Sequence, residues 1–138
     1  MTTIAYRDGV IAGDSLVSEQ GLIVGTMTKV GKRGPILFGC AGDAAFAKAF
    51  LDWIAGGMQG DCPQTPREDA QGIIAYDGHI LSFMSHGIDR MKADYYAIGS
   101  GQRAALGAMA VGATAEEAVR AVVKTDCYSG GEITVLRA

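Results

Sequence analysis

Apolar residues in this chain occur mostly in short runs separated by glycine-containing turns. Residues 3–6 and 10–13 flank the dipeptide DG, and the segment GIIAYDGHILSF has the same dipeptide between two apolar runs. Such pairs are typical of β-hairpins, because glycine adopts a positive φ at little cost and two-residue turns require it. The pattern therefore predicts a protein built largely of antiparallel strands.

Further short runs predict more strands along the chain. They cover residues 16–18, 22–24, 28–32, 36–41, 95–99 and 132–138. The run ILFGCA at 36–41 is almost continuously apolar, as expected for a buried strand. Residues 84–94 fit either a loop or a continued extended segment.

Three segments have the periodicity of helices. Residues 44–55 place four large apolar side chains on one face, namely Phe46, Phe50, Trp53 and Ile54. Asp43 precedes this helix as a capping residue, and two glycines follow it. Residues 102–111 form the second predicted helix. The third runs from Thr114 to about residue 124, with Glu117 completing a capping-box pattern.

This order of elements predicts the fold class. Many strands, one helix, a hairpin, two helices and a final strand indicate a layered α+β domain. The 138 residues suit a single domain covering residues 1–138, with one main core. Hydrophobic residues make up 49% of the chain and charged residues 20%, which argues against disorder. Periodicity and composition give no activity.

Charge and cysteine content exclude several classes of partner. The net charge is −3, and no basic stretch would neutralise phosphates, so we expect no nucleic-acid partner. No apolar run approaches the roughly 20 residues of a membrane span, and no secretion signal is visible. The three cysteines are widely spaced, which indicates reduced thiols in a cytoplasmic protein. They also lack metal-ligand spacing, and we expect neither a metal nor a cofactor.

Thr2 is the first candidate for chemistry. A hydroxyl is a weak nucleophile without a base. A threonine at a free N-terminus supplies its own base, because the pKa of an α-amine is about 8. This chemistry requires removal of Met1, which a small second residue generally permits. Taken alone, Thr2 carries little weight, since many chains begin with Met-Thr.

Asp14 and Lys29 could support that nucleophile. Asp14 follows the second predicted strand, and the hairpin returns the end of that strand beside Thr2. A lysine ammonium near the α-amine lowers the pKa of the amine, and a carboxylate holds the lysine in place. Taken singly, Asp14 also fits an ordinary turn carboxylate, and Lys29 fits an exposed charge at a strand edge.

Several motifs occur in an order that matches one family. They are TTIAYRDGVIAGDS, TKV, FGCAGDAAFAKAF, YAIGSG and DCYSGGEITVL. With these motifs, most of the chain resembles proteasome β-type subunits, and it most resembles the bacterial peptidase HslV, the partner of an AAA+ unfoldase. Any one motif is a weak signal, but five in order form a strong one.

The resemblance implies a catalytic centre at the N-terminus. It makes Thr2 the nucleophile and, through its amine, the base, with Asp14 and Lys29 as a supporting pair. It makes the backbone N–H of Gly42 an oxyanion donor. On its own residue type, Gly42 also fits a plain turn between a strand and a helix.

The resemblance assigns roles to five more residues. Ser100, Asp126 and Ser129 would support the terminal amine, the last two as an Asp-x-x-Ser motif. Ser18 would align substrate as an added strand, and Cys40 would line the pocket for the side chain that precedes the cut. Ser100 also fits a helix N-cap, and Asp126 with Ser129 fits a simple turn.

The resemblance also implies an architecture. The family has the Ntn-hydrolase fold, a four-layer αββα sandwich of two antiparallel sheets. Only residues 56–70, expected as a loop or a short turn of helix, stand where the family has a second long helix. One helix layer should therefore be reduced. Such helices build contacts between stacked rings in the family, so ring stacking and any unfoldase docking surface stay open.

The expected function is that of a threonine-type peptidase subunit in a homo-oligomeric ring. It would cleave peptides or unfolded proteins, and an AAA+ unfoldase is a candidate partner. Two alternatives stay open. One is a catalytically inactive ring or scaffold protein of the same fold. The other is an amidohydrolase that acts on small molecules through the same mechanism.

Overall fold

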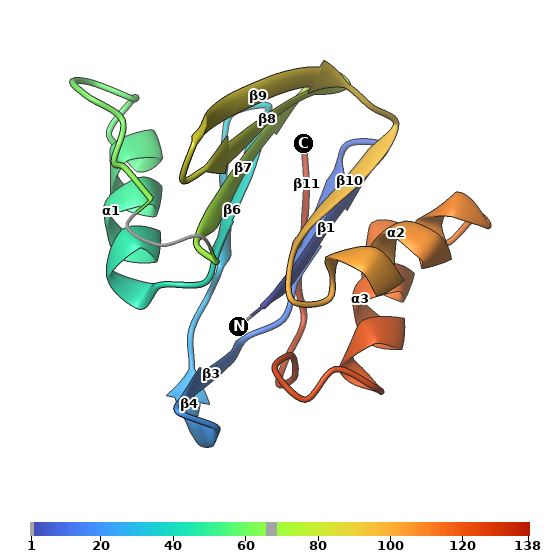
Figure 1. Cartoon of the computed structure of the whole chain (residues 1–138). Helices are drawn as coiled ribbons and strands as arrows, with labels where there is room; N and C mark the ends of the chain where they lie inside the picture. Colours follow the sequence, from blue (N-terminus) through green and yellow to red (C-terminus); the bar gives the residue numbers. More distant parts are fainter. Residues whose placement is uncertain (1, 66–68) are drawn as a thin grey trace.

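Two antiparallel sheets face each other at the centre of the molecule, and helices cover their outer faces (Figure 1). In this computed structural model, residues 2–65 and 69–138 are described. The first sheet has the order β10 (Tyr95–Gly99), β1 (Thr3–Arg7), β2 (Val10–Gly13) and β11 (Thr134–Arg137). The second has the order β5 (Val30–Arg33), β6 (Ile36–Ala41), β7 (Gln71–Tyr76), β8 (His79–Met84) and β9 (Gly87–Lys92).

A two-stranded hairpin of β3 (Leu16–Glu19) and β4 (Leu22–Thr26) projects from one end of the sheets (Figure 1). The turn residues of the predicted hairpins have the expected backbone. Asp8 and Gly9 have φ of 50° and 74°, and Asp77 and Gly78 have φ of 49° and 75°. Two successive positive φ values match the twist of antiparallel strands, so these turns fix the strand register.

Helices lie on the two outer faces (Figure 1). Helix α1 (Ala44–Ala55) covers the five-stranded sheet, while α2 (Gln102–Ala110) and α3 (Ala115–Val123) cover the four-stranded sheet. Both predicted N-caps form: Asp43 accepts from the N–H of Phe46, and Thr114 forms a complete capping box with Glu117. These caps satisfy amides that have no partner inside the helix.

Three apolar clusters hold the layers together. Between the sheets lie Ile4, Tyr6, Ile11, Val30, Leu37, Ala41, Ile73, Ala75, Ile80 and Ile98. Under α1 lie residues that include Phe46, Phe50, Ile54, Ile74 and Phe83. Under α2 and α3 lie residues that include Ala97, Ala105, Met109, Ala118, Val119 and Val122. Helix, sheet, sheet and helix therefore form the four-layer αββα arrangement that the family resemblance implies.

The helix layer over the five-stranded sheet is reduced to one helix, as expected. Residues 56–65 contain no helix, so α1 stands alone over the five-stranded sheet among the described residues. The remainder of the predicted loop includes 66–68, which lie outside the described residues. For residues 84–94 the sequence left a loop and an extended segment open. Most of this segment forms strand β9, which pairs with β8 along its whole length. No helix of the described chain is long and apolar enough to cross a membrane.

Candidate active site

A cleft of about 870 Å³ opens beside Thr2, at the end of the sheets from which the β3–β4 hairpin projects. Its lining includes five of the residues selected from sequence: Thr2, Ser18, Lys29, Cys40 and Gly42. Three others, Asp14, Ser100 and Ser129, form hydrogen bonds with Thr2 or Thr3, and Asp126 accepts hydrogen bonds from both serines. The fold thus brings all nine sequence-selected residues to one end of the molecule.

The Asp14–Lys29 pair is buried beside this cleft. Lys29 Nζ lies 3.0 Å from Asp14 Oδ1, and the two side chains are 5% and 0% exposed. Asp14 directly follows β2, where its N–H still donates to the carbonyl of Thr3 at 3.2 Å. Hairpin pairing between β1 and β2 therefore carries the carboxylate to the start of β1. Lys29 is therefore not an exposed charge at a strand edge, and Asp14 is a buried ion-pair partner as well as a residue that follows a strand.

Asp14 accepts hydrogen bonds from several backbone amides as well as from Lys29. The N–H of Thr3 donates to Oδ1 at 3.0 Å, and the N–H groups of Gly130 and Leu16 donate to Oδ2 at 2.9 and 3.3 Å. Charge-assisted bonds of this kind compensate a buried carboxylate for the water it has lost. Asp14 consequently ties β1, β3 and the segment before β11 to one point.

Burial has a larger effect on the pKa of Lys29 than Asp14 has. It lowers the pKa of this lysine, and the attraction and hydrogen bond of Asp14 oppose that change. Lys29 lines the same cleft as Thr2, and Asp14 offsets part of its charge. An ammonium in this position disfavours a second positive charge nearby, so it would lower the pKa of a free α-amine on Thr2.

A second polar network contacts Thr2 and Thr3. Ser100 Oγ donates to Asp126 Oδ2 at 2.6 Å and is 3.3 Å from the carbonyl oxygen of Thr2. Ser129 Oγ donates to the same Asp126 oxygen at 2.7 Å, and it shares a 2.7 Å hydrogen bond with Thr3 Oγ1. The network links the β10–α2 turn and the α3–β11 connection to the first two residues of the described chain.

Two alternatives from the sequence are settled here. Ser100 does not cap α2, because the cap position is Gly101, which makes no side-chain hydrogen bond. Asp126 does shape a turn, since it accepts from the N–H of Tyr128 at 3.2 Å, but it also binds both serines. Partial burial raises the pKa of Asp126, and the bonds from Ser100, Ser129 and Tyr128 outweigh it, so the net pKa is lowered.

Gly42 lies where β6 meets α1, on the cleft wall. Its φ is +100°, and a Cβ there would lie 2.5 Å from the carbonyl oxygen of Asp69. Only glycine fits this position, for reasons of both backbone and space. The adjacent start of α1 carries a partial positive charge. The position is therefore compatible with a backbone donor toward a developing oxyanion, as the family resemblance implies.

Cys40 and Ser18 line the cleft on different walls. Cys40 is 1% exposed, and burial raises the pKa of its thiol to about 12. The thiol is therefore neutral at physiological pH and suits an apolar pocket floor better than a nucleophile. Ser18 lies in β3, next to a register shift between Val17 and Ser18. The strand therefore presents an irregular edge to the cleft.

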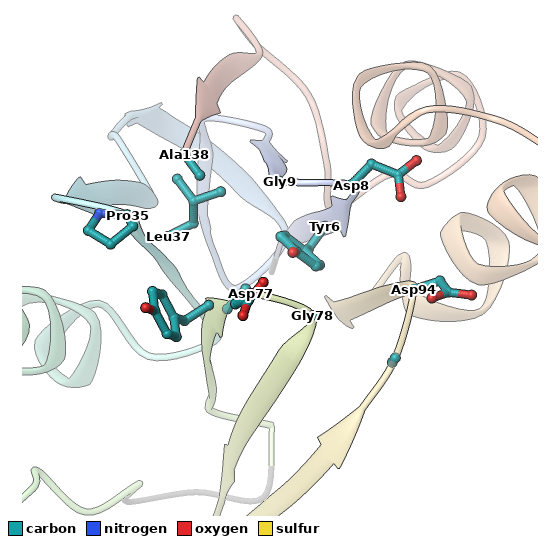
Figure 2. Close-up of a pocket in the computed structure, with 12 residues that line it drawn as sticks. Tyr6, Asp8, Gly9, Pro35, Leu37, Asp77, Gly78, Asp94 and Ala138 are labelled. Atoms are coloured by element: carbon teal, nitrogen blue, oxygen red, sulfur yellow. The ribbon is translucent and has the colours of Figure 1, made fainter.

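A second cavity of about 480 Å³ lies at the opposite end of β1 (Figure 2). Tyr6, Leu37 and Ala138 line it, together with the turns at Asp8-Gly9 and Asp77-Gly78. Its lining has no threonine, serine or lysine, and its carboxylates belong to exposed residues. We therefore assign the candidate site to the cleft beside Thr2.

The structure adds residues that the sequence did not single out. Thr3 contacts both Asp14 and Ser129. Gly99 and Gly101 have no room for a Cβ, which would lie 1.9 Å from the Thr2 carbonyl oxygen and 2.1 Å from Thr3 Oγ1, respectively. The two glycines around Ser100 are a signal of close backbone approach that the sequence did offer. Gln71, which binds the Gly99 N–H, had no such signal.

Comparisons with known proteins agree with this architecture. No protein-family model matches the sequence, and no curated protein is significantly similar to it. Among solved structures, Thiobacillus denitrificans BPH superposes with a TM-score of 0.71 at 22% identity, over 98% of this chain and 95% of that one. A structure of the same protein in complex with epoxomicin gives the same TM-score and identity, over 98% and 96% of the two chains.

The eukaryotic HslV from Trypanosoma brucei superposes with a TM-score of 0.70 at 19% identity, over 99% of both chains. These identities support a statement about fold. The chain has the Ntn-hydrolase fold of HslV-type, proteasome-like peptidases over nearly its whole length, and the resemblance found in its motifs is confirmed at that level.

Proposed function

We propose that this chain is a threonine-type peptidase subunit that uses Thr2 as its nucleophile after removal of Met1. The observation that carries the proposal is the buried Lys29–Asp14 ion pair in the wall of the cleft that Thr2 lines. Burying two charges is costly, and a structural role alone is served as well by apolar residues. A pair placed next to a hydroxyl and its amine instead serves the chemistry of those groups.

The reaction begins with attack by Thr2 Oγ1 on the carbonyl carbon of the scissile peptide bond. The hydroxyl proton passes to the α-amine of Thr2, directly or through one water. The Gly42 N–H stabilises the oxyanion of the tetrahedral intermediate. The intermediate collapses with cleavage of the C–N bond, and the ammonium of Thr2 returns its proton to the leaving amine. An ester on Thr2 remains.

Water then cleaves that ester. The α-amine takes a proton from the attacking water, and a second tetrahedral intermediate forms on the same carbon. Its collapse releases the carboxylic acid product and restores the Thr2 hydroxyl with the proton held by the amine. Lys29 favours the neutral, basic amine throughout, because its charge disfavours a protonated neighbour.

Ser100, Asp126 and Ser129 have a supporting role in this proposal. They form the hydrogen-bonded network against the Thr2 carbonyl and Thr3 hydroxyl, and that network restricts the position of the nucleophile. Restricting a nucleophile to a reactive geometry lowers the entropic part of the barrier. Ser18 and Cys40 would bind substrate, the first along β3 and the second at the pocket floor.

We further propose a homo-oligomeric ring in the cytoplasm, formed by this single domain, with peptides or unfolded proteins as substrates. An open cleft on a protease would otherwise attack folded proteins. The similarity to HslV supports this assembly and makes an AAA+ unfoldase a candidate partner.

The test combines intact mass with reaction toward epoxomicin, the compound bound in the structure of Thiobacillus denitrificans BPH. We expect loss of one methionine and one epoxomicin adduct per chain, and no adduct on Thr2→Ala. A chain that retains Met1 and forms no adduct would contradict the proposal and favour the inactive ring protein. An adduct together with cleavage of small amides but not of peptides would favour the amidohydrolase.

A further inference from the structure

Gln71 reaches from one sheet to the other beside Thr2. It is the first residue of β7, and its backbone is paired with Ala41 at the end of β6. Its side-chain oxygen accepts a hydrogen bond of 3.0 Å from the N–H of Gly99, at the end of β10 in the facing sheet. Its amide nitrogen donates to Met84 Sδ at 3.6 Å. The glutamine thus bridges the two layers at the site end of the molecule.

The chemistry of the primary amide suits both contacts. The Gly99 N–H is a donor, so its partner atom has to be the glutamine oxygen. The Met84 sulfur is a weak acceptor, which suits the NH₂ group. An apolar side chain at this position would leave a partly buried N–H without its partner, at a cost larger than the hydrogen bond itself contributes.

The bond at Gly99 controls the backbone that touches Thr2. Gly99 has a φ of +96°, and its Cα approaches Thr2 so closely that a Cβ would lie 1.9 Å from the Thr2 carbonyl oxygen. The next residue is Ser100, whose hydroxyl contacts that same carbonyl oxygen and Asp126. A shift of the Gly99–Ser100 turn would therefore move Thr2 and its supporting network together.

The chain just before Gln71 touches the other half of the site. A Cβ on Gly42 would lie 2.5 Å from the Asp69 carbonyl oxygen and 2.7 Å from Ala70 Cα. Residues 69–71 thus pack against the oxyanion glycine, and the Gln71 side chain binds the turn that holds the nucleophile. The hydrogen bond between Gln71 and Gly99 therefore links these two parts of the site across the sheets.

We propose that Gln71 is a positioning residue that sets the placement of Thr2 relative to Gly42. The inference rests on the proposed function, since it concerns the same nucleophile. Nucleophilic attack depends steeply on such placement, while initial binding of a ligand in the cleft does not. Loss of Gln71 should therefore slow the covalent step and leave ligand affinity almost unchanged.

The test measures inactivation by epoxomicin and separates the maximal rate constant, kinact, from the half-saturating concentration, KI. For Gln71→Met we expect kinact to fall about 10- to 30-fold, with KI within about twofold of the native value. Gln71→Asn keeps the amide but shortens the side chain by one methylene, and it should show the same loss. Gln71→Glu keeps an acceptor for Gly99 and should recover most of kinact.

The matched control is Gln102→Met. Gln102 is also a partly buried glutamine, the first residue of α2, and its Nε2 donates to the Ala97 carbonyl oxygen at 2.9 Å. Its side-chain hydrogen bond goes to Ala97 and not to Gly99, Ser100 or Thr2, so kinact should stay within about twofold. Thermal unfolding of each variant checks that the compared proteins are folded.

The outcomes separate the inference from the proposed function. A native chain that forms no adduct contradicts the proposed function and the inference with it. A reactive native chain, with Gln71→Met and Gln71→Asn as fast as Gln102→Met, overturns the inference alone. Failure of Gln71→Glu to exceed the folded Asn variant would also overturn it, because the acceptor would then not be the feature that matters.

Discussion

The two ends of β1 lead into two cavities of very different character. At the Thr2 end, side chains from several elements form continuous hydrogen-bonded networks around a cleft of about 870 Å³. At the Asp8 end, a smaller cavity is bounded by two turns and by Tyr6, Leu37 and Ala138 (Figure 2). Asp8, Asp77 and Asp94 on that side are exposed to solvent.

Burial of polar groups separates the two ends most clearly. The buried polar residues of the described chain are Thr2, Thr3, Asp14, Ser15, Lys29, Ser82 and Ser129. All except Ser82 belong to the Thr2 end or directly follow Asp14. Burial of polar groups is costly unless they are paired, so their concentration at the Thr2 end favours that end as the candidate site. None of these buried polar residues lines the cavity at the Asp8 end.

The largest expected effect is on the buried ion pair. Asp14→Asn should lower the free energy of unfolding by about 3–5 kcal/mol, because it leaves the Lys29 ammonium buried without its counter-charge. Urea unfolding measures this difference. The matched change at the other end, Asp77→Asn, removes an exposed carboxylate. A similar cost for both variants would break the contrast between the two ends.

Two glycines with positive φ offer a steric test of the same contrast. Gly99→Ala should destabilise the protein by about 3 kcal/mol or more, because the new Cβ would overlap the Thr2 carbonyl oxygen as well as strain the backbone. Gly78 also has a positive φ, +75°, but a Cβ added there would have no atom within 4 Å. Gly78→Ala should cost only the backbone strain, about 1–2 kcal/mol. Thermal unfolding of both variants measures the difference.

The pH dependence of stability should report Asp126. Its pKa is lowered from the usual 3.8, so the folded chain binds fewer protons than the unfolded chain near that value. The stabilising contribution is therefore complete above pH 3.8 and is lost as the pH falls through the folded pKa. The difference in unfolding free energy between the native chain and Asp126→Asn should shrink in acid. A difference that grows below pH 3.8 would contradict the assignment.

The smallest effect is expected at the second cavity. Asp94→Asn should change the unfolding free energy by no more than about 0.5 kcal/mol, because an exposed charge at a turn makes little net contribution. Its rate of inactivation by epoxomicin should match that of the native chain within about twofold. A marked loss of reactivity would show that this end communicates with the Thr2 cleft.

Much of the fold could be predicted from local patterns. The DG turns, the alternating runs and the Asp43 and Thr114 caps each depend on residues close in sequence, and all form where expected. The segment 84–94 could not be decided in advance. It is a strand because β8 offers an unpaired edge there, and that edge exists only in the assembled sheet.

The candidate site could be predicted in part. Its nine selected residues meet at one end of the molecule. Hairpin geometry returns Asp14 to Thr2, while the others come from strands and connections that only the packed sheets bring together. The contacts that join them span up to 126 positions, as between Thr3 and Ser129. No local pattern encodes such a pairing. The roles of these residues stay predictions until the proposed experiments are made.

The sequence by itself determined most of the strands, the helices, their caps and the tight turns, since these depend on propensities and hydrogen bonds within a few residues. It also determined which residue types were available for chemistry. Tertiary structure alone decided that Lys29 is buried, that Ser100 binds Thr2 in place of capping a helix, and that Gln71 spans the two sheets. These outcomes depend on which surfaces meet when the two sheets pack, and that is a property of the whole chain.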